Sequence, residues 1–193
     1  DLYRSYGAVF SYKNQPNTQR YDILDKKGEK NMILVTTGTQ KFPFNRLLKA
    51  VDKEIKAGVI TEDVFAQIGA SDYRPENYKF SPFLTADEMQ NLRKQSRLII
   101  THAGTNSIIE GLKLGIPVIT VPRRKEFGEH VDDHQMEITE EFEKEGLVTA
   151  VYDIDKLGDA IREAISKNPP VYNGHGGQLL QKIVDLCTGK EQL

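Results

Sequence analysis

From residue 32 to residue 187 the chain alternates between two kinds of sequence, and this alternation limits the folds open to it. Short runs of apolar and β-branched residues are typical of strands buried on both faces. The stretches between them carry apolar residues at every third or fourth position, as a helix with one apolar face does. Strands that alternate with helices predict an α/β fold with an open, doubly wound, mostly parallel sheet.

The predicted elements can be placed by residue number. Six strands are expected within residues 32–37, 64–69, 78–84, 96–104, 117–122 and 147–152. Helices are expected from Pro43 to Gly58, at 86–94, at 105–114, at 132–145, after a cap at Asp155, and at 175–187. In such sheets ligands bind beyond the carboxyl ends of the strands. The loops to consider are therefore 37–43, 69–78, 83–88, 102–106 and 122–135.

The chain divides into three parts by composition. Residues 1–31 are polar and rich in tyrosine, with one short strand predicted in "YGAVFSY"; we interpret them as a linker, a tag or the tail of a fused partner-like segment. Residues 32–187 form the predicted domain, and residues 188–193 a C-terminal tail.

Charge and cysteine content narrow the function. A net charge of −2 over 193 residues gives no electrostatic reason to expect binding to nucleic acid. The single cysteine, Cys187, excludes an internal disulfide and argues against a cysteine-based metal site. No apolar run is long enough to span a bilayer, so a role at a membrane would require a surface or a partner.

Two glycines follow buried strands and precede helices. Gly38, with Thr39, follows the first strand, and Gly104 ends the fourth strand and is followed by Thr105 and Asn106. A glycine there lets backbone N–H groups approach a phosphate, and a helix N-terminus adds favourable partial charge. A lone glycine at such a position favours the simpler interpretation, a tight strand-to-helix turn. Two such turns on one sheet edge favour an anion site.

Two other residues near the second turn have two interpretations each. His102 is either a core histidine, which is the commoner case, or a functional group. Glu110 either compensates the dipole of its helix or accepts hydrogen bonds from sugar hydroxyls.

The stretch "EFGEHVDDHQ" gathers His130, Asp132, Asp133 and His134. These residue types can bind a metal, but the irregular spacing favours a helix start capped by an aspartate. A polar sugar-binding loop is the third interpretation. The basic run at 123–125 is interpreted as a solvated surface, with a phosphate clamp as the alternative.

Three motifs in combination resemble a known family. "HAGTNSIIEGLKLGIPVITVP", "EHVDDHQ" and "EGLV" follow one another, and "VTTGTQKFPFNRLL" precedes them. Together they resemble the C-terminal, donor-binding half of family 28 glycosyltransferases over about residues 32–186. The match is closest to the single-domain branch, which includes the catalytic subunit of the dolichol-linked GlcNAc transferase and bacterial exopolysaccharide glycosyltransferase subunits. The resemblance implies one Rossmann-like lobe of a GT-B architecture.

The resemblance also implies roles for residues that match the motifs. Those around the donor diphosphate would be Gly38, Thr39, Gly104, Thr105 and Asn106. Glu110 would bind the ribose, and the backbone near Phe83 and Leu84 would contact the uracil. His134 and Gln135 would contact the donor sugar, although most family members carry a glutamine pair there, which leaves the sugar open.

The implied activity is inverting, metal-independent transfer from a UDP-sugar to a lipid-linked glycan acceptor, with the UDP-sugar as substrate and no cofactor. The chain has length for one lobe, so the resemblance implies a membrane-anchored partner that supplies the acceptor lobe and holds the protein at the cytosolic membrane face. The 175–187 helix is its candidate docking surface. The candidates for the general base are His102 and His134, with a base on the partner as the alternative.

Three rival functions remain. The first is a non-catalytic, nucleotide-sugar-binding regulatory subunit. The second is a sugar-nucleotide epimerase, which requires two lobes and is disfavoured by the length. The third is a metal hydrolase that uses His130, Asp133 and His134 and would lose activity on chelation.

Overall fold

The computed structural model describes residues 31–170 and 172, which form one sheet with helices on both faces. The strands are β1 (Met32–Thr36), β2 (Asp63–Gln67), β3 (Lys79–Ser81), β4 (Ser96–Thr101), β5 (Val118–Thr120) and β6 (Thr149–Ala150). The helices are α1 (Asn45–Lys56), α2 (Ala86–Gln95), α3 (Thr105–Lys113), α4 (His134–Lys144) and α5 (Leu157–Ser166), with 3-10 turns η1 (Lys125–Phe127) and η2 (Ile154–Lys156).

The sheet is parallel throughout, with strand order β3-β2-β1-β4-β5-β6. From β1 the chain proceeds outward to β3, returns to β4 beside β1, and then proceeds the other way to β6. The order therefore reverses between β1 and β4. Open α/β sheets bind ligands in the crevice outside the carboxyl ends of the strands at such a reversal. The predicted doubly wound fold is confirmed.

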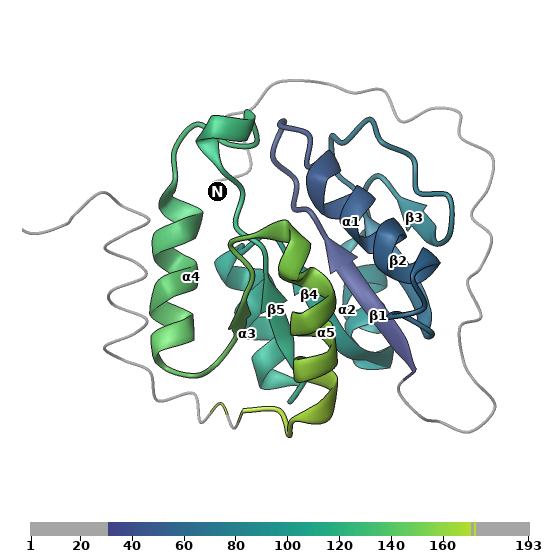
Figure 1. Ribbon diagram of the computed structural model, residues 1–193, viewed down its shortest axis with the longest axis vertical. Helices are drawn as coiled ribbons and strands as arrows, with labels where there is room; N and C mark the ends of the chain where they lie inside the picture. Colours follow the sequence, from purple (N-terminus) through teal and green to yellow (C-terminus); the bar gives the residue numbers. More distant parts are fainter. Residues whose placement is uncertain (1–30, 171, 173–193) are drawn as a thin grey trace, which may run out of the picture.

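Both faces of the sheet are covered, which explains why β1 is apolar at four successive positions (Figure 1). Ile33 and Val35 pack in the cluster that α1 and α5 cover. Met32 and Leu34 pack in the opposite cluster, to which α2, α3 and α4 contribute. Side chains alternate along a strand, so a strand between two helical layers needs apolar residues at every position.

Some element boundaries differ from the predicted ones. The first helix begins at Asn45, because Phe44 is its N-cap and the Phe44 N–H donates to Ser71 Oγ at 2.9 Å. Pro43 therefore lies before the helix. Asp155 does not cap the fifth helix: its own N–H donates to the Asp153 side chain, and a 3-10 turn intervenes.

Strands β3 and β6 are shorter than predicted, with three and two residues. Both are edge strands, and only the residues that pair with a neighbour have strand geometry. The strand predicted within 1–31, the helix at 175–187 and the domain boundary after residue 187 lie outside the described residues. No helix in the described part of the chain is long and apolar enough to cross a membrane.

Candidate functional site

The loops that leave β1 and β4 begin side by side at the reversal point. Thr36, the last residue of β1, pairs with Thr101, the last residue of β4. One residue further, the backbone N–H of His102 donates to the Thr36 carbonyl at 3.1 Å. The two loops with the predicted glycine turns therefore leave the same point of the sheet edge.

Gly38 and Gly104 both lie against the imidazole of His102. A Cβ atom on either glycine would lie 2.5 Å from His102 Nε2, closer than real Cβ contacts allow. Gly38 also has a φ of +76°, which L side chains rarely adopt. We call these three residues the glycine–histidine cluster. Glycine is needed at both positions because the ring fills the space between the loops.

The environment of His102 keeps its imidazole neutral. Nδ1 lies 3.2 Å from the Thr36 carbonyl, so Nδ1 carries the proton and Nε2 is the acceptor nitrogen. Burial, together with the nearby positive charge of Arg123, lowers the pKa of His102 to about 4. At pH 7 the ring therefore has a lone pair on Nε2 and no charge.

The first turn of α3 faces the crevice without a side-chain cap. Ala103 is buried with a φ of +65°, an uncommon value for a residue with a Cβ, and it turns the chain from β4 into α3. Gly104 is the N-cap; it makes no side-chain cap, and the first turn contains no acidic residue. The N–H groups of Thr105 and Asn106 have no carbonyl within the helix to pair with, and the helix dipole adds positive partial charge there.

Gln67, at the end of β2, fixes the Gly38 loop against the loop that follows β3. Its amide nitrogen donates to the Gly38 carbonyl at 2.9 Å and to the Pro82 carbonyl at 3.1 Å. The Thr37 N–H donates back to the Gln67 carbonyl at 3.0 Å. The sequence patterns did not indicate this residue; the only signal was an amide at the end of a buried apolar strand.

This bridge brings the β3–α2 loop close to the cluster. Phe83 is 39% exposed, and its carbonyl accepts a hydrogen bond from Ser81 Oγ at 2.7 Å. Leu84 packs against the second core cluster. Phe83 and Leu84 are therefore held in place beside the Gly38 loop, and we call these two residues the β3–α2 ledge.

The basic run at 123–125 is not uniformly solvated, and the prediction that it is was wrong for Arg123. This side chain is fully buried, whereas Lys125 is exposed. Its guanidinium donates to the carbonyls of Thr37, Phe42, Pro43 and Glu129 and does not face solvent. The reason lies in the tertiary structure: the guanidinium satisfies carbonyls of a loop about eighty positions earlier in the chain.

Gln135 and His134 begin α4 but have different environments. Gln135 is 8% exposed, and its amide oxygen accepts the Arg123 N–H at 3.0 Å. Because this oxygen is already paired, the side chain can offer a ligand the two N–H donors of its amide nitrogen. His134 is about half exposed and lies 3.1 Å from Glu137 through Nδ1. Gln135 is thus joined to the β1 loop through Arg123, whereas His134 pairs along its own helix.

The acidic and histidine residues before α4 form a local network. His130 Nδ1 lies 2.8 Å from Asp132 Oδ1, which also accepts the His134 N–H at 3.2 Å. Asp133 is the N-cap residue, but its carboxylate accepts the Lys125 N–H. Asp132 rather than Asp133 therefore caps the first turn. Within residues 31–170 and 172 no three His, Cys, Asp or Glu side chains are grouped so that they could hold a metal ion.

Glu110 lies on α3, about one and a half turns after its start. It is partly buried and pairs with Lys113 at 3.0 Å. Arg93, on α2, is a further positive charge close enough to interact with it. Among the residues that the structure describes, none of the hydrogen bonds of Glu110 reaches the glycine–histidine cluster.

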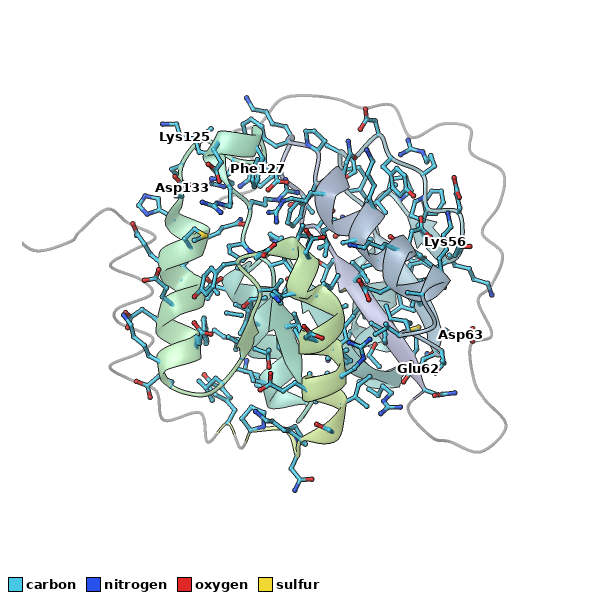
Figure 2. All side chains as sticks on the ribbon, in the orientation of Figure 1. Lys56, Glu62, Asp63, Lys125, Phe127 and Asp133 are labelled. Atoms are coloured by element: carbon cyan, nitrogen blue, oxygen red, sulfur yellow. The ribbon has the colours of Figure 1, made fainter. Side chains whose placement is uncertain are left out.

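A hollow lies at the other end of the sheet. Figure 2 shows Lys125, Phe127 and Asp133 near the carboxyl ends of the strands, and Glu62 and Asp63 at the opposite end. The hollow has a volume of about 340 Å³ and is lined by Met32, Ile55, Glu62, Asp63, Val64, Glu76, Asn77, Tyr78 and Lys79. Its position at the amino ends of β1 and β2 separates it from the crevice.

Comparison with known proteins shows which family and fold the chain shares. The sequence profile of the glycosyltransferase family 28 C-terminal domain matches residues 32–183. The UDP-N-acetylglucosamine transferase subunit ALG13 of Debaryomyces hansenii is 28% identical over 150 residues, which cover 72% of this chain and 69% of that protein. ALG13 of Eremothecium gossypii is 33% identical over 91 residues, covering 45% and 43%.

Solved structures show the same fold. The NMR solution structure of ALG13 has a TM-score of 0.54 at 20% identity, covering 81% of this chain and 96% of that one. The glycosyltransferase of kitacinnamycin has a TM-score of 0.58 at 19% identity, covering 91% and 43%. The chain thus spans less than half of the second protein and corresponds to one Rossmann-like lobe of a GT-B glycosyltransferase. With a family profile that covers most of its length, this chain belongs to the glycosyltransferase family 28 C-terminal domain family.

Proposed function

We propose that this chain is the donor-binding and catalytic subunit of an inverting, metal-independent glycosyltransferase that moves a sugar from a UDP-sugar to a lipid-linked glycan acceptor. One observation carries the proposal: Gly38 and Gly104 meet over a buried, neutral histidine at the reversal point of the sheet. The relatives named as UDP-N-acetylglucosamine transferase subunits support the choice of donor.

The diphosphate would bind between the two glycine loops. Thr105 and Asn106 offer open N–H groups at the start of α3, and Gly38 and Thr39 offer the backbone of the β1 loop. Backbone donors and a helix dipole stabilise the negative charge that builds up as the diphosphate departs, which is the task a metal performs in other transferases.

The rest of the donor would extend along both sides of this point. Glu110 is five residues after Thr105, about 7.5 Å along the helix axis, which suits a ribose joined to a diphosphate at the helix start. The ledge at Phe83 and Leu84 would contact the uracil. The donor sugar would lie toward His134 and Gln135, whose amide donors suit sugar hydroxyls.

In the proposed reaction the acceptor hydroxyl oxygen attacks the anomeric carbon from the face opposite UDP. The bond between that carbon and the diphosphate oxygen breaks, UDP leaves with the electron pair, and the hydroxyl proton passes to a base. His102 has an available Nε2, but a pKa of about 4 makes it a weak base until the bound diphosphate adds negative charge nearby. His134 and a base on the partner are the other candidates.

A second lobe would complete the enzyme. The chain corresponds to one of the two lobes of a GT-B glycosyltransferase, so the acceptor would be bound by a membrane-anchored partner, and the chain would act in the cytoplasm at the cytosolic membrane face. The helix at 175–187, outside the described residues, is the candidate docking element. We propose no cofactor, since the UDP-sugar is the substrate.

One observation favours the alternative, a non-catalytic subunit that binds nucleotide sugar. The titratable side chain in the glycine–histidine cluster is His102, and burial makes it weakly basic. Calorimetry with UDP-sugars on the isolated chain, followed by a transfer assay of a membrane fraction that holds the partner lobe, with and without this chain, separates the two. Transfer that occurs only when this chain is present supports catalysis. Transfer by the membrane fraction alone, with a rate that this chain changes, supports a regulatory role.

The ribose assignment is tested by Glu110→Ala with Lys113→Ala as the matched control. Both variants remove the same surface ion pair, but only the first removes the carboxylate. We expect Glu110→Ala to weaken UDP binding about tenfold or more, because a hydrogen bond to a charged group contributes about 1.5–3 kcal/mol. Lys113→Ala should bind UDP like the wild type. Equal affinities in the two variants would remove Glu110 from the site.

A further inference from the structure

Arg123 is a buried charge that the proposed reaction does not use. It follows β5, is completely covered by protein, and stacks its guanidinium over the Phe44 ring at 4.8 Å. Burial lowers its pKa to about 10, and the carboxylate of Glu129 acts in the opposite direction. Among the described residues its Nε finds no hydrogen-bond partner. A buried and incompletely paired charge disfavours folding, so its presence requires a reason.

The guanidinium of Arg123 donates hydrogen bonds to both ends of the loop that follows β1, residues 37–43. Nη2 donates to the Thr37 carbonyl at 2.6 Å, immediately before Gly38. Nη1 donates to the Phe42 carbonyl at 2.9 Å and to the Pro43 carbonyl at 3.3 Å, at the far end of the loop. Residues 38–41 therefore span two points held by one planar group, which limits the conformations open to Gly38 and Thr39.

The same residue reaches two other parts of the site. Its backbone N–H donates to the amide oxygen of Gln135 at 3.0 Å and so orients the donors of that side chain. Its positive charge lowers the pKa of His102. Nη1 also donates to the carbonyl of Glu129, whose carboxylate is held by Arg46 of α1 at 2.8 Å. The Arg46–Glu129 pair thus keeps the far side of Arg123 in place.

We propose that Arg123 is a positioning residue for the donor: its guanidinium holds the 37–43 loop in the shape that receives the diphosphate, and its backbone aims the Gln135 amide at the donor sugar. This inference rests on the proposed donor site. Arg123 touches no substrate in this scheme, because protein covers it completely and its Nη1 and Nη2 groups already donate to backbone carbonyls.

Two substitutions separate the effect of the planar shape of the Arg123 guanidinium from the effect of its positive charge. Arg123→Lys keeps a positive charge but replaces the planar fork with a single ammonium that cannot reach both ends of the loop. Arg123→Met keeps the stem and removes the charge. Leu98→Ala, in a fully buried position in the amino-terminal half of β4, is the control for lost stability. UDP affinity is measured by calorimetry below each variant's unfolding temperature, and the His102 pKa by NMR titration of the imidazole.

We expect Arg123→Lys to bind UDP about ten- to a hundredfold more weakly than the wild type, as misplaced binding groups do, while the His102 pKa stays low. Arg123→Met should lose the same affinity, and its His102 pKa should rise. Leu98→Ala should unfold more easily yet bind UDP normally. If Arg123→Met does not fold, Arg123→Lys still decides, because it retains charge and stem.

The outcomes distinguish this inference from the proposed function. Wild-type protein that binds no UDP would defeat the donor site itself. Wild-type protein that binds UDP, together with an Arg123→Lys variant of equal affinity, would overturn the positioning role alone. Equal losses in Arg123→Lys and Leu98→Ala would also overturn it, because general destabilisation would then explain both.

Discussion

Gly104 and Gly38 show at the scale of single residues why this site permits so few substitutions. Both glycines lie beyond the ends of their strands, and a methyl group on either would overlap the imidazole of His102. Gly58 is the useful contrast, because it has a φ of +71° and, apart from its own neighbours along the chain, no described atom lies within 4 Å of the position that its Cβ would occupy. A steric requirement and a conformational one can therefore be separated by experiment.

Alanine substitutions at Gly104 and Gly58 should have different consequences. Gly104 has an ordinary φ of −67°, so alanine there is penalised only by overlap with His102, by about 1–3 kcal/mol. Gly58→Ala should cost about 1–2 kcal/mol through its backbone conformation alone. Urea unfolding measures both costs. UDP calorimetry should show binding lost in Gly104→Ala and retained in Gly58→Ala; normal binding by Gly104→Ala would contradict the cluster.

The pKa of His102 predicts how stability depends on pH. The unfolded chain binds a proton at His102 near pH 6.5, whereas the folded chain binds it only near pH 4, because burial lowers the pKa to about 4. Between these values the unfolded state carries more protons, so stability falls as the pH falls through this window, by roughly 3 kcal/mol in all.

The measurement is urea unfolding of the wild type and His102→Asn at several pH values between 4 and 7. His102→Asn cannot bind a proton at this position and should not lose the stability that the wild type loses as the pH falls. The difference between the two free energies of unfolding should therefore narrow or reverse at low pH. Parallel curves would show that the folded-state pKa of His102 is not lowered.

At the scale of elements, the loop from β5 to α4 is joined to α1 by one buried ion pair. Arg46 donates through two nitrogens to both carboxylate oxygens of Glu129, at 3.0 and 2.8 Å, and the Arg124 N–H adds a third bond at 3.1 Å. The Glu129 side chain is 5% exposed. This pair helps to hold the loop that carries Phe127, a residue that is 54% exposed.

Glu129→Ala should therefore destabilise the domain more than loss of any exposed pair. Removing one partner of a buried pair costs about 3 kcal/mol or more, since the other charge stays behind. Lys53→Ala, which breaks a pair exposed on both sides, should leave the urea midpoint nearly unchanged. Equal midpoints for the two variants would mean that the Arg46–Glu129 pair does not stabilise the loop.

The elements also show what a sequence can and cannot predict. The sequence pattern located all six strands and the helices of the described part, because their signals are local. A strand such as β1, buried on both faces, is apolar at successive positions. A helix such as α2 has its own cap in the neighbouring residues Thr85 and Glu88. Arg123 could not be placed that way: a charged run normally predicts solvent, and its carbonyl partners lie about eighty positions away. Gln67 and the positive φ of Ala103 were missed for the same reason.

At the scale of the whole molecule, the described part of the chain is one lobe, and its candidate site lies at one end of the sheet. The glycine–histidine cluster, the β3–α2 ledge and the start of α4 all lie at the carboxyl ends of the strands, and the hollow lined by Glu62 and Asp63 lies at the other end. Because the two ends lie apart, titration with UDP alone can test whether the donor binds at the carboxyl ends of the strands. The sequence predicted that the site lies on this edge, because the loops after parallel strands share it.

The most direct test is a titration of the isotopically labelled chain with UDP, followed residue by residue through the backbone amide resonances. We expect saturable shifts concentrated at Gly38, Gly104, Thr105 and Asn106, with smaller shifts at Asp63 and its neighbours in the opposite hollow. The absence of a saturable shift in the four amides, or shifts concentrated around Asp63, would contradict the proposed donor site.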